Sequence, residues 1–156
     1  MGKIDMTNVR LLFAVLSLFS ATAAIGADKF ATREDVESLV AKVVQAVNAD
    51  QATTVAEITA RDRKWVRMDL YPVIYDINGK CLAHGLNENM AGKQLIDMTD
   101  ADGKPFVRDR IRLAKAKGKF WHEYKFIDPV TRKALPKSVY CEKTSELIVC
   151  AGVYQR

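Results

Sequence analysis

Hydrophobic residues recur at helical spacing in the first third of the chain. Valines and leucines fall three and four positions apart between residues 36 and 47, and the spacing resumes from residue 52 to about residue 60. Thr32 and Asp35 occupy the positions of a capping box, so we expect a helix to begin at residue 31 or 32. The step Asn48-Ala49-Asp50 is where it bends or breaks. The pattern predicts one long helix or two consecutive helices, whose apolar face covers a sheet.

After residue 64 the hydrophobic period changes to that of β-strands. Segments 70–77 and 80–86 are predicted strands, and the Asn78-Gly79 pair between them is a strong hairpin signal. A short helix or an irregular crossing follows at 90–98, and Pro105 opens a helix that ends near Gly118.

Three further strands are predicted near the end of the chain, at 120–127, 135–143 and 147–154. The element order is helix, two strands, short helices and three strands. It predicts an α+β domain with a five-stranded antiparallel sheet, a long N-terminal helix packed on one face and short helices on the other.

The last predicted hairpin brings two cysteines together. With Ser145-Glu146 as a two-residue loop, Cys141 lies opposite Cys150 in a non-hydrogen-bonded pair, where Cα atoms approach to about 4.5 Å. That spacing suits a disulfide, which we predict here. The alternative is two buried thiols, because a loop register shifted by one residue breaks the pairing. Cys81 is expected to be a buried structural thiol.

The start of the chain has the pattern of a secretory signal. Lys3 and Arg10 give a basic start, an apolar run follows at 11–19, and small residues lead to Ala27. We therefore expect a signal peptide at 1–27, cleavage near Ala27, and one domain at 28–156 in the periplasm or outside the cell, where disulfides persist. An uncleaved anchor is the alternative, although the uncharged stretch is slightly shorter than the roughly 20 residues of a membrane span.

Composition narrows the function classes. The net charge is +5, yet no run of like charges is present, which argues against a nucleic-acid partner. Two His and three Cys make a multi-ligand metal site improbable, and we expect no cofactor. The sequence contains no Ser-His-Asp set in motif context, no paired-His spacing and no Gly-rich phosphate loop, so we do not expect an enzyme.

A series of short motifs runs in order through residues 70–154. They are Tyr75-Asp76-Ile77-Asn78-Gly79, Ala83-His84, Gly92-Lys93, Asp102-Gly103, Phe120 with Tyr124, Pro136-Lys137 with Tyr140, and Gly152-Val153-Tyr154. In this order and spacing, the segment resembles the single Cache domain family, the PAS-like extracytoplasmic sensors of bacterial chemoreceptors and sensor kinases. Two departures are that Phe120 stands where a second glycine is common, and that Cys141 and Cys150 look like an addition.

The resemblance implies a ligand-binding module. The sequence ends two residues after Tyr154, where a receptor of this family would continue into a second membrane helix, so we expect no output region in this chain. Its expected partners are a small-molecule ligand and a membrane receptor or kinase. The long opening helix also allows a homodimer.

In this family the ligand lies between the sheet and the connector, which here is 87–118. A small organic anion such as a carboxylate needs one or two cationic donors and aromatic walls. Lys137, at the family's Pro-Lys position, is the first candidate donor. The other candidate ligand-binding residues are Tyr75, His84, Met90, Arg108, Trp121, Tyr124 and Tyr140.

Each candidate also has an ordinary structural explanation, such as a solvated strand lysine, a half-buried tyrosine or a satisfied imidazole. The stretch 108–110 is typical of a solvated helix face. Tyr124 does not share a strand face with Trp121. Lys137 and Tyr140 face opposite ways unless a bulge intervenes or Lys137 lies before the strand proper.

The sequence therefore favours an exported, soluble binding domain for a small organic anion. The alternative is a ligand-free periplasmic interaction or structural protein, and a secreted enzyme is a weaker third hypothesis.

Overall fold

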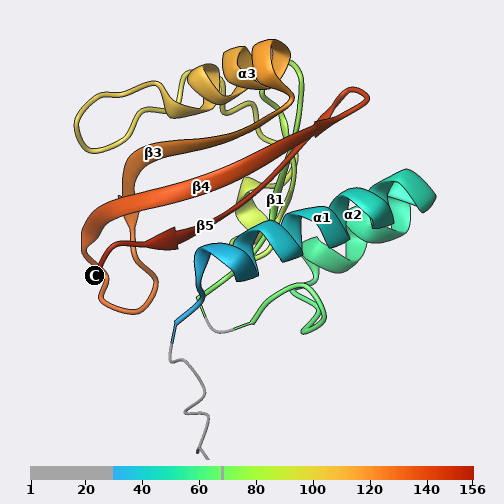
Figure 1. The fold of residues 1–156 in the computed structure, drawn as a ribbon, viewed down its shortest axis with the longest axis horizontal. Helices are drawn as coiled ribbons and strands as arrows, with labels where there is room; N and C mark the ends of the chain where they lie inside the picture. Colours follow the sequence, from blue (N-terminus) through green and yellow to red (C-terminus); the bar gives the residue numbers. More distant parts are fainter. Residues whose placement is uncertain (1–29, 68) are drawn as a thin grey trace, which may run out of the picture.

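The computed structural model of the protein describes residues 30–67 and 69–156. The predicted signal segment 1–27 lies outside these residues. Within them, five strands form one antiparallel sheet with helices on both of its faces (Figure 1). The predicted α+β architecture is therefore confirmed.

Helix α1 (Arg33–Ala49) begins with the predicted capping box. The Thr32 hydroxyl accepts a hydrogen bond from the Asp35 backbone N–H (3.2 Å), and the Asp35 carboxylate accepts one from the Thr32 backbone N–H (3.0 Å). The pair satisfies two backbone donors that a helix start leaves open. The helix breaks where the sequence predicts, because the Asp50 carboxylate accepts a backbone N–H of the next turn (3.0 Å) and so caps α2 (Gln51–Thr59).

The sheet places the last strand of the sequence at its centre. The strands are β1 (Val73–Asp76), β2 (Cys81–His84), β3 (Lys119–Ile127), β4 (Ala134–Thr144) and β5 (Leu147–Tyr154). They lie in the order β2-β1-β5-β4-β3, so β5 lies between β1 and β4. β1 is shorter than the predicted segment 70–77, because Pro72 has no N–H to donate to a neighbouring strand.

The predicted Asn-Gly hairpin joins β1 to β2. Gly79 adopts a φ of 90°, a left-handed conformation that glycine reaches without steric cost, and its N–H donates to the Asp76 carbonyl (3.1 Å). The two strands pair antiparallel, with a register shift between Ile74 and Tyr75. This hairpin carries Tyr75 and His84 at the edge of the sheet.

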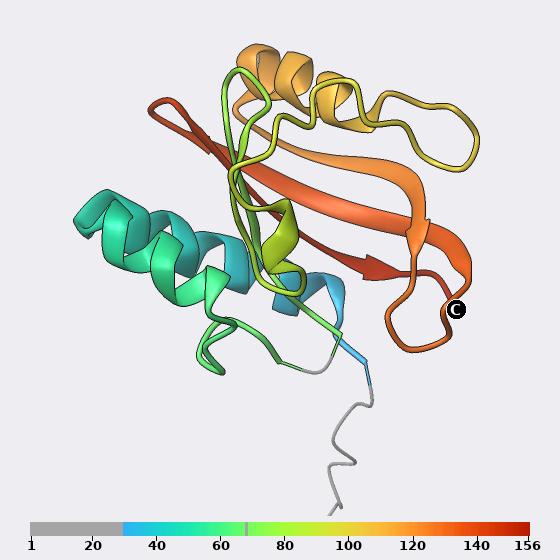
Figure 2. The ribbon, with the colours of Figure 1, turned by 180° about the vertical axis from the view of Figure 1, so that it is seen from behind.

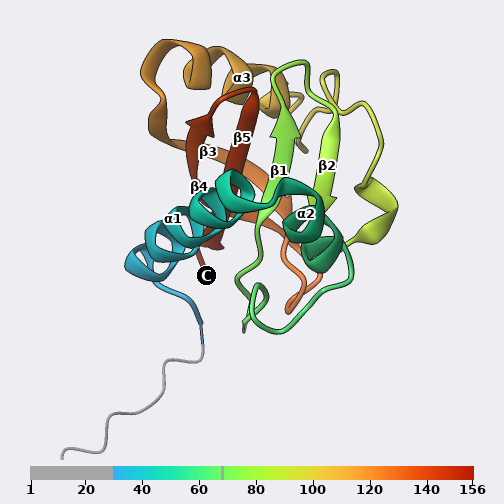
Figure 3. The same ribbon diagram turned by 90° about the vertical axis from the view of Figure 1, so that its right-hand side faces the viewer.

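Different segments cover the two faces of the sheet. Helices α1 and α2 pack on one face, while the short 3₁₀ helix η1 (Glu88–Met90), the connector and α3 (Phe106–Lys117) cover the other. Figure 1 shows α3 and the first two helices on opposite sides of the sheet, and Figures 2 and 3 show the same layers from behind and from the side. The apolar core between α1 and the sheet includes Val36, Val40, Val43 and Val47 of the helix.

The alternation of side chains along β4 is regular. From Lys137 to Thr144 every residue pairs in turn with β5, so this stretch contains no bulge. Val139 and Cys141 belong to the core under α3, whereas Tyr140 packs on the α1 side. Lys137 has the parity of Val139, and it therefore faces away from Tyr140.

The predicted disulfide joins Cys141 and Cys150. The two residues lie directly opposite each other on β4 and β5, with Cα atoms 4.2 Å apart. Both side chains are buried, and Cys81 is a buried free thiol. The loop register inferred from Ser145-Glu146 is therefore confirmed.

The two ends of the described domain meet at an ion cluster in which two carboxylates are buried and the arginine is partly exposed. The Arg156 guanidinium contacts the carboxylates of Asp69 and Asp128, each at 2.7 Å. Asp69 also accepts the backbone N–H of Ala31 (3.0 Å), just before α1. Burial alone would raise the pKa of Asp128, but hydrogen bonds from Arg156 and Thr131 outweigh it and hold that pKa well below its usual value. The cluster ties β5 to the start of α1.

Removing the disulfide should weaken the domain only modestly. The bond spans a sequence separation of 9, and so short a loop contributes less than the about 3 kcal/mol of a 15-residue loop. We expect the Cys141→Ala/Cys150→Ala variant to lose about 1–3 kcal/mol of unfolding free energy, measured by urea denaturation. Reductant should lower the midpoint of the control variant Cys81→Ala just as it does for the wild type. A loss well above that range would contradict a role limited to holding the hairpin.

Candidate functional site

A small cavity lies between the sheet and the connector, on the face away from α1. Its volume is about 20 Å³, enough for about one water molecule. It is lined by Tyr71, Val73, Tyr75, His84, Met90, Leu95, Met98, Phe106, Arg110, Tyr124, Phe126, Lys137, Val139, Cys150, Ala151 and Gly152. Apolar and aromatic side chains dominate this lining, and two cations project into it.

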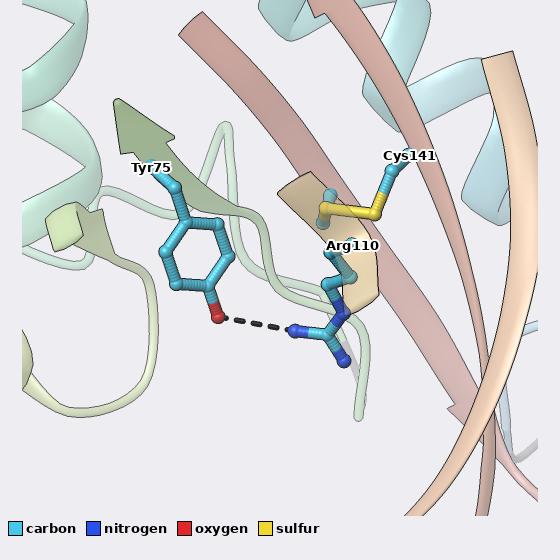
Figure 4. The surroundings of a disulfide bond; sticks show 4 residues. Tyr75, Arg110 and Cys141 are labelled. Carbon is cyan, nitrogen blue, oxygen red and sulfur yellow. Dashed lines mark hydrogen bonds between the residues drawn. A yellow bond between two sulfur atoms is a disulfide. The ribbon is translucent and has the colours of Figure 1, made fainter. Parts of the chain in front are cut away.

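Arg110 enters the cavity from α3. Its side chain is 2% exposed, and the guanidinium lies 4.4 Å from the Tyr124 ring centroid and 4.9 Å from that of Phe106. Nη1 donates a hydrogen bond to the Tyr75 hydroxyl (3.1 Å), and Figure 4 shows the two groups pointing toward each other beside the disulfide. Nε and Nη2 are buried and have no hydrogen-bond partner among the described residues. One edge of this cation is therefore left open.

Lys137 brings a second cation from β4. It is 3% exposed, and Nζ donates to the Tyr71 hydroxyl (2.8 Å) while lying 4.5 Å from the Tyr154 ring centroid. Burial, reinforced by the positive charge of Arg110, lowers the pKa of Lys137 to about 7. The ammonium and the neutral amine are therefore both accessible near neutral pH.

His84 at the end of β2 is a neutral imidazole. Its Nδ1 accepts the backbone N–H groups of Leu86 (3.2 Å) and Asn87 (3.1 Å), which leaves Nε2–H as its donor. The ring stacks on Tyr71, with centroids 5.2 Å apart. Burial, followed by the charge of Lys137, lowers the pKa of His84 to about 4. The residue therefore adds a donor to the cavity without adding a third positive charge.

The two cations have no acidic partner. Among residues 30–67 and 69–156, no Asp or Glu forms an ion pair with Arg110 or Lys137. The negative charges of Asp69 and Asp128 act to raise the pKa of Lys137, but Arg156 already forms ion pairs with both carboxylates. Buried charges normally carry a counter-charge, so the cavity contains positive charge that no described acidic residue compensates.

The structure places five of the eight predicted site residues around this cavity. They are Tyr75, His84, Met90, Tyr124 and Lys137. Tyr124 and Lys137 lie opposite each other in the β3–β4 ladder, so the regular alternation of these two strands brings both side chains to the same face. The five residues come from five different segments, namely β1, β2, η1, β3 and β4, which the fold brings together.

The other three predicted site residues lie elsewhere. Trp121 and Tyr140 pack against each other on the α1 side, with tilted rings whose centroids are 5.4 Å apart, and the Trp121 indole donates to Glu37 of α1 (3.0 Å). Arg108 is exposed on the outer side of α3 and pairs with Asp97. These residues therefore have structural partners away from the cavity.

Sequence reasoning missed Arg110 and Tyr71. The expectation of a solvated face at 108–110 is wrong for Arg110, which follows Val107 by three positions and precedes Ala114 by four, and so shares their buried face. That spacing was the available signal. Tyr71 precedes the observed β1 but lies in the predicted strand 70–77, and the alternation of that segment places it on the same face as Val73 and Tyr75, which was the available signal.

Other classes of site find no support in the described ranges. Within 30–67 and 69–156, no group of three His, Cys, Asp or Glu residues is placed to hold a metal ion. In the same residues, no helix has both the length and the apolar character needed to cross a membrane.

The fold and the charged cavity define a PAS-like sensory domain of the Cache type. The sequence profile of the family described as single Cache domain 2 matches residues 5–155, nearly the whole chain. The chain therefore belongs to the single Cache domain 2 family, which is a non-catalytic sensory family. Comparison with curated protein sequences found no match.

Solved structures of sensor domains share the fold. A methyl-accepting chemotaxis protein from Vibrio parahaemolyticus is 18% identical, with a TM-score of 0.65 over 78% of this chain and 86% of that one. A Cache chemosensory domain studied for carboxylic acid recognition is 20% identical, with a TM-score of 0.67 over 79% and 92%. The periplasmic sensor domain of a chemotaxis protein is 19% identical, with a TM-score of 0.62 over 79% and 90%.

Arg110 should be costly to the unliganded fold. A buried cation without a counter-charge is unfavourable, so Arg110→Met should leave the unfolding free energy unchanged or raise it by up to about 2 kcal/mol in urea denaturation. The matched control Ile111→Ala, one residue along the same helix face, should lose about 2–5 kcal/mol. A loss of that size in Arg110→Met would show that the guanidinium is a structural support instead of a binding group.

Proposed function

We propose that this chain is an exported sensory domain that binds a small organic anion, a carboxylate, between Arg110 and Lys137. The observation that carries the proposal is the pair of buried cations, which lack an acidic partner within the described residues and line one cavity. A carboxylate would supply the missing negative charge. The relatives support a sensory role, and one of them is described by its recognition of carboxylic acids.

The open edge of Arg110 has the geometry that a carboxylate requires. Nε and Nη2 lie side by side on the guanidinium, and both are free of partners among the described residues. Two parallel N–H donors bind the two oxygens of a carboxylate as a fork. Tyr75 holds the opposite side through Nη1, so this edge is already oriented before a ligand arrives.

Lys137 and His84 complete the proposed anion site. Lys137 supplies a point charge to the same anion, and its charged form is favoured once the anion is present. His84 keeps its Nε2–H as a neutral donor because backbone N–H groups occupy Nδ1. The aromatic rings of Tyr124 and Phe106 exclude water and so strengthen these interactions.

The proposed location is the periplasm or the exterior of the cell, after removal of residues 1–27. The disulfide fits an oxidising compartment. We further propose that the domain has no catalytic role and reports occupancy to a membrane receptor or kinase, with a homodimer as one form of the assembly.

A ligand-free interaction protein is the second candidate function. The observation that favours it is the cavity volume of about 20 Å³, which is far below the roughly 300–1,000 Å³ of common small-molecule sites. In that case, packed side chains fill the site, and no small anion stabilises the domain.

Carboxylates should stabilise the purified domain against heat. At 100 times its dissociation constant, a ligand adds about 2.7 kcal/mol, which moves the midpoint by several degrees. We expect a thermal-shift screen of carboxylates, amino acids and neutral metabolites to give its hits among the carboxylates. Absence of any shift in a folded protein would favour the interaction protein.

Variants of the two cations, with a matched control, test whether the ligand that causes the thermal shift binds in this cavity. Arg110→Met and Lys137→Met should each abolish or greatly reduce the shift, because each removes one cation while keeping an unbranched, flexible side chain. Tyr140→Phe lies on the opposite face and should leave it unchanged. A shift that survives Arg110→Met and Lys137→Met would place the ligand elsewhere.

Affinity should fall as the pH rises above about 7. The pKa of Lys137 in the free protein is about 7, so above that pH the amine is neutral and must take up a proton to bind an anion. We expect the dissociation constant to rise toward about tenfold per pH unit above 7 and to stay nearly flat from pH 5 to 6.5, measured by calorimetry. Lys137→Met should bind more weakly and lose this slope. A wild-type profile that stays flat to pH 9 would contradict a role for the lysine charge.

A further inference from the structure

A second, larger hollow adjoins the charged cavity. Its volume is about 290 Å³, and it opens between the end of β2 and the loop after β3. It is lined by Tyr71, His84, Leu86, Asn87, Met90, Phe126, Ile127, Pro129 and Arg132. We call it the outer hollow, and the cavity that holds Arg110 and Lys137 the inner cavity.

The two spaces share a wall. Tyr71, His84, Met90 and Phe126 line both of them. Met90 is only partly buried and has an unbranched, adaptable side chain. A group that enters the inner cavity past these residues therefore leaves the rest of its molecule in the outer hollow.

The outer hollow differs from the inner cavity in its chemistry. Its lining carries one cation, Arg132, which is exposed at the rim, and most of the remaining surface is aliphatic or aromatic. Ile127, which lines the hollow, is 53% exposed, and Val130, which follows Pro129 of the lining in sequence, is 54% exposed. In the described part of the chain they are the exposed large hydrophobic residues. Apolar surface left open beside a cavity is typical of a binding groove.

The volumes explain why one space alone is not enough. The inner cavity of about 20 Å³ admits little more than a polar head group. Together with the outer hollow of about 290 Å³, the space reaches the lower end of the roughly 300–1,000 Å³ found for small-molecule sites.

We propose that the ligand is a carboxylate with an extended apolar tail, with its head group on Arg110 and Lys137 and its tail in the outer hollow. This inference rests on the proposed function and names the ligand class of the same site. The inner cations select the negative charge, and Leu86, Phe126 and Ile127 select the apolar tail. A second charge at the far end of the ligand would lose this contact.

The length of the tail should set the affinity. Each buried methylene contributes about 0.8 kcal/mol, which corresponds to about three- to fourfold in the dissociation constant. Calorimetry with acetate, propionate, butyrate, hexanoate and octanoate should therefore show stepwise tightening beyond propionate. 6-Hydroxyhexanoate, which has the chain length of hexanoate but ends in an uncharged hydroxyl group, should bind more weakly than hexanoate.

Two leucine variants separate the tail from the head group. Leu86→Gln places a polar amide in the outer hollow without adding charge, and should weaken octanoate by at least about threefold while changing acetate by less than twofold. Leu82→Gln is the matched control, because Leu82 is an equally half-buried leucine near α2, outside both spaces. Leu82→Gln should leave the dissociation constants of all the acids, from acetate to octanoate, unchanged. Arg110→Met should abolish binding of both short and long acids.

The outcomes distinguish this inference from the proposed function. Affinity that is flat or falls beyond propionate would overturn the tail site while the carboxylate sensor stands. Octanoate binding that persists in Arg110→Met would overturn it as well, because the tail would then bind independently of the head group. If no acid of any length binds the wild type, both proposals fail.

Discussion

The cost of burying a positive charge governs the organisation of this domain. Arg110 and Lys137 are almost completely removed from water, and aromatic rings and hydroxyls surround them in place of carboxylates. Rings and hydroxyls offset part of the desolvation penalty, but they leave the cavity positive. The other ion cluster shows the contrast, because Arg156 is matched there by two carboxylates. The Arg156 cluster is neutralised within the described residues, whereas the charges of Arg110 and Lys137 are not.

The central position of β5 separates the apolar packing under α1 from the cavity on the opposite face of the sheet. Every residue from Leu147 to Gly152 is buried, because helices cover both faces of the sheet. Alternation along β4 and β5 then sends apolar side chains toward α1 on one face and builds the cavity wall on the other. The valine face of α1 supplies much of the packing, so the α3 face can accommodate buried polar groups.

Much of the fold was predictable because it depends on local patterns. The capping box, the Asn-Gly turn and the cross-strand cysteines each involve residues close in sequence, and each is observed. Strand parity also separated Lys137 from Tyr140 correctly. Arg110 was not identified, because three charged residues in a row favour a solvated face and only its spacing from Val107 and Ala114 indicated burial. Tyr71 shares the parity of Tyr75 in the predicted strand 70–77, so its face was predictable, but its contact with Lys137 joins distant segments, and no local pattern encodes that contact.

In the proposed site, the inner cavity and the outer hollow would each contribute to ligand binding through a different physical effect. Charged hydrogen bonds are strongest in a small, dry space, so the cations belong in a cavity that the head group fills completely. The hydrophobic effect depends on the area buried and is not directional, so an apolar tail needs room more than exact placement. If the proposed site binds its ligand in this way, it would discriminate in two independent steps. The inner cavity would reject neutral molecules because its cations would stay unpaired, and the outer hollow would rank the remaining acids by the apolar surface they bury.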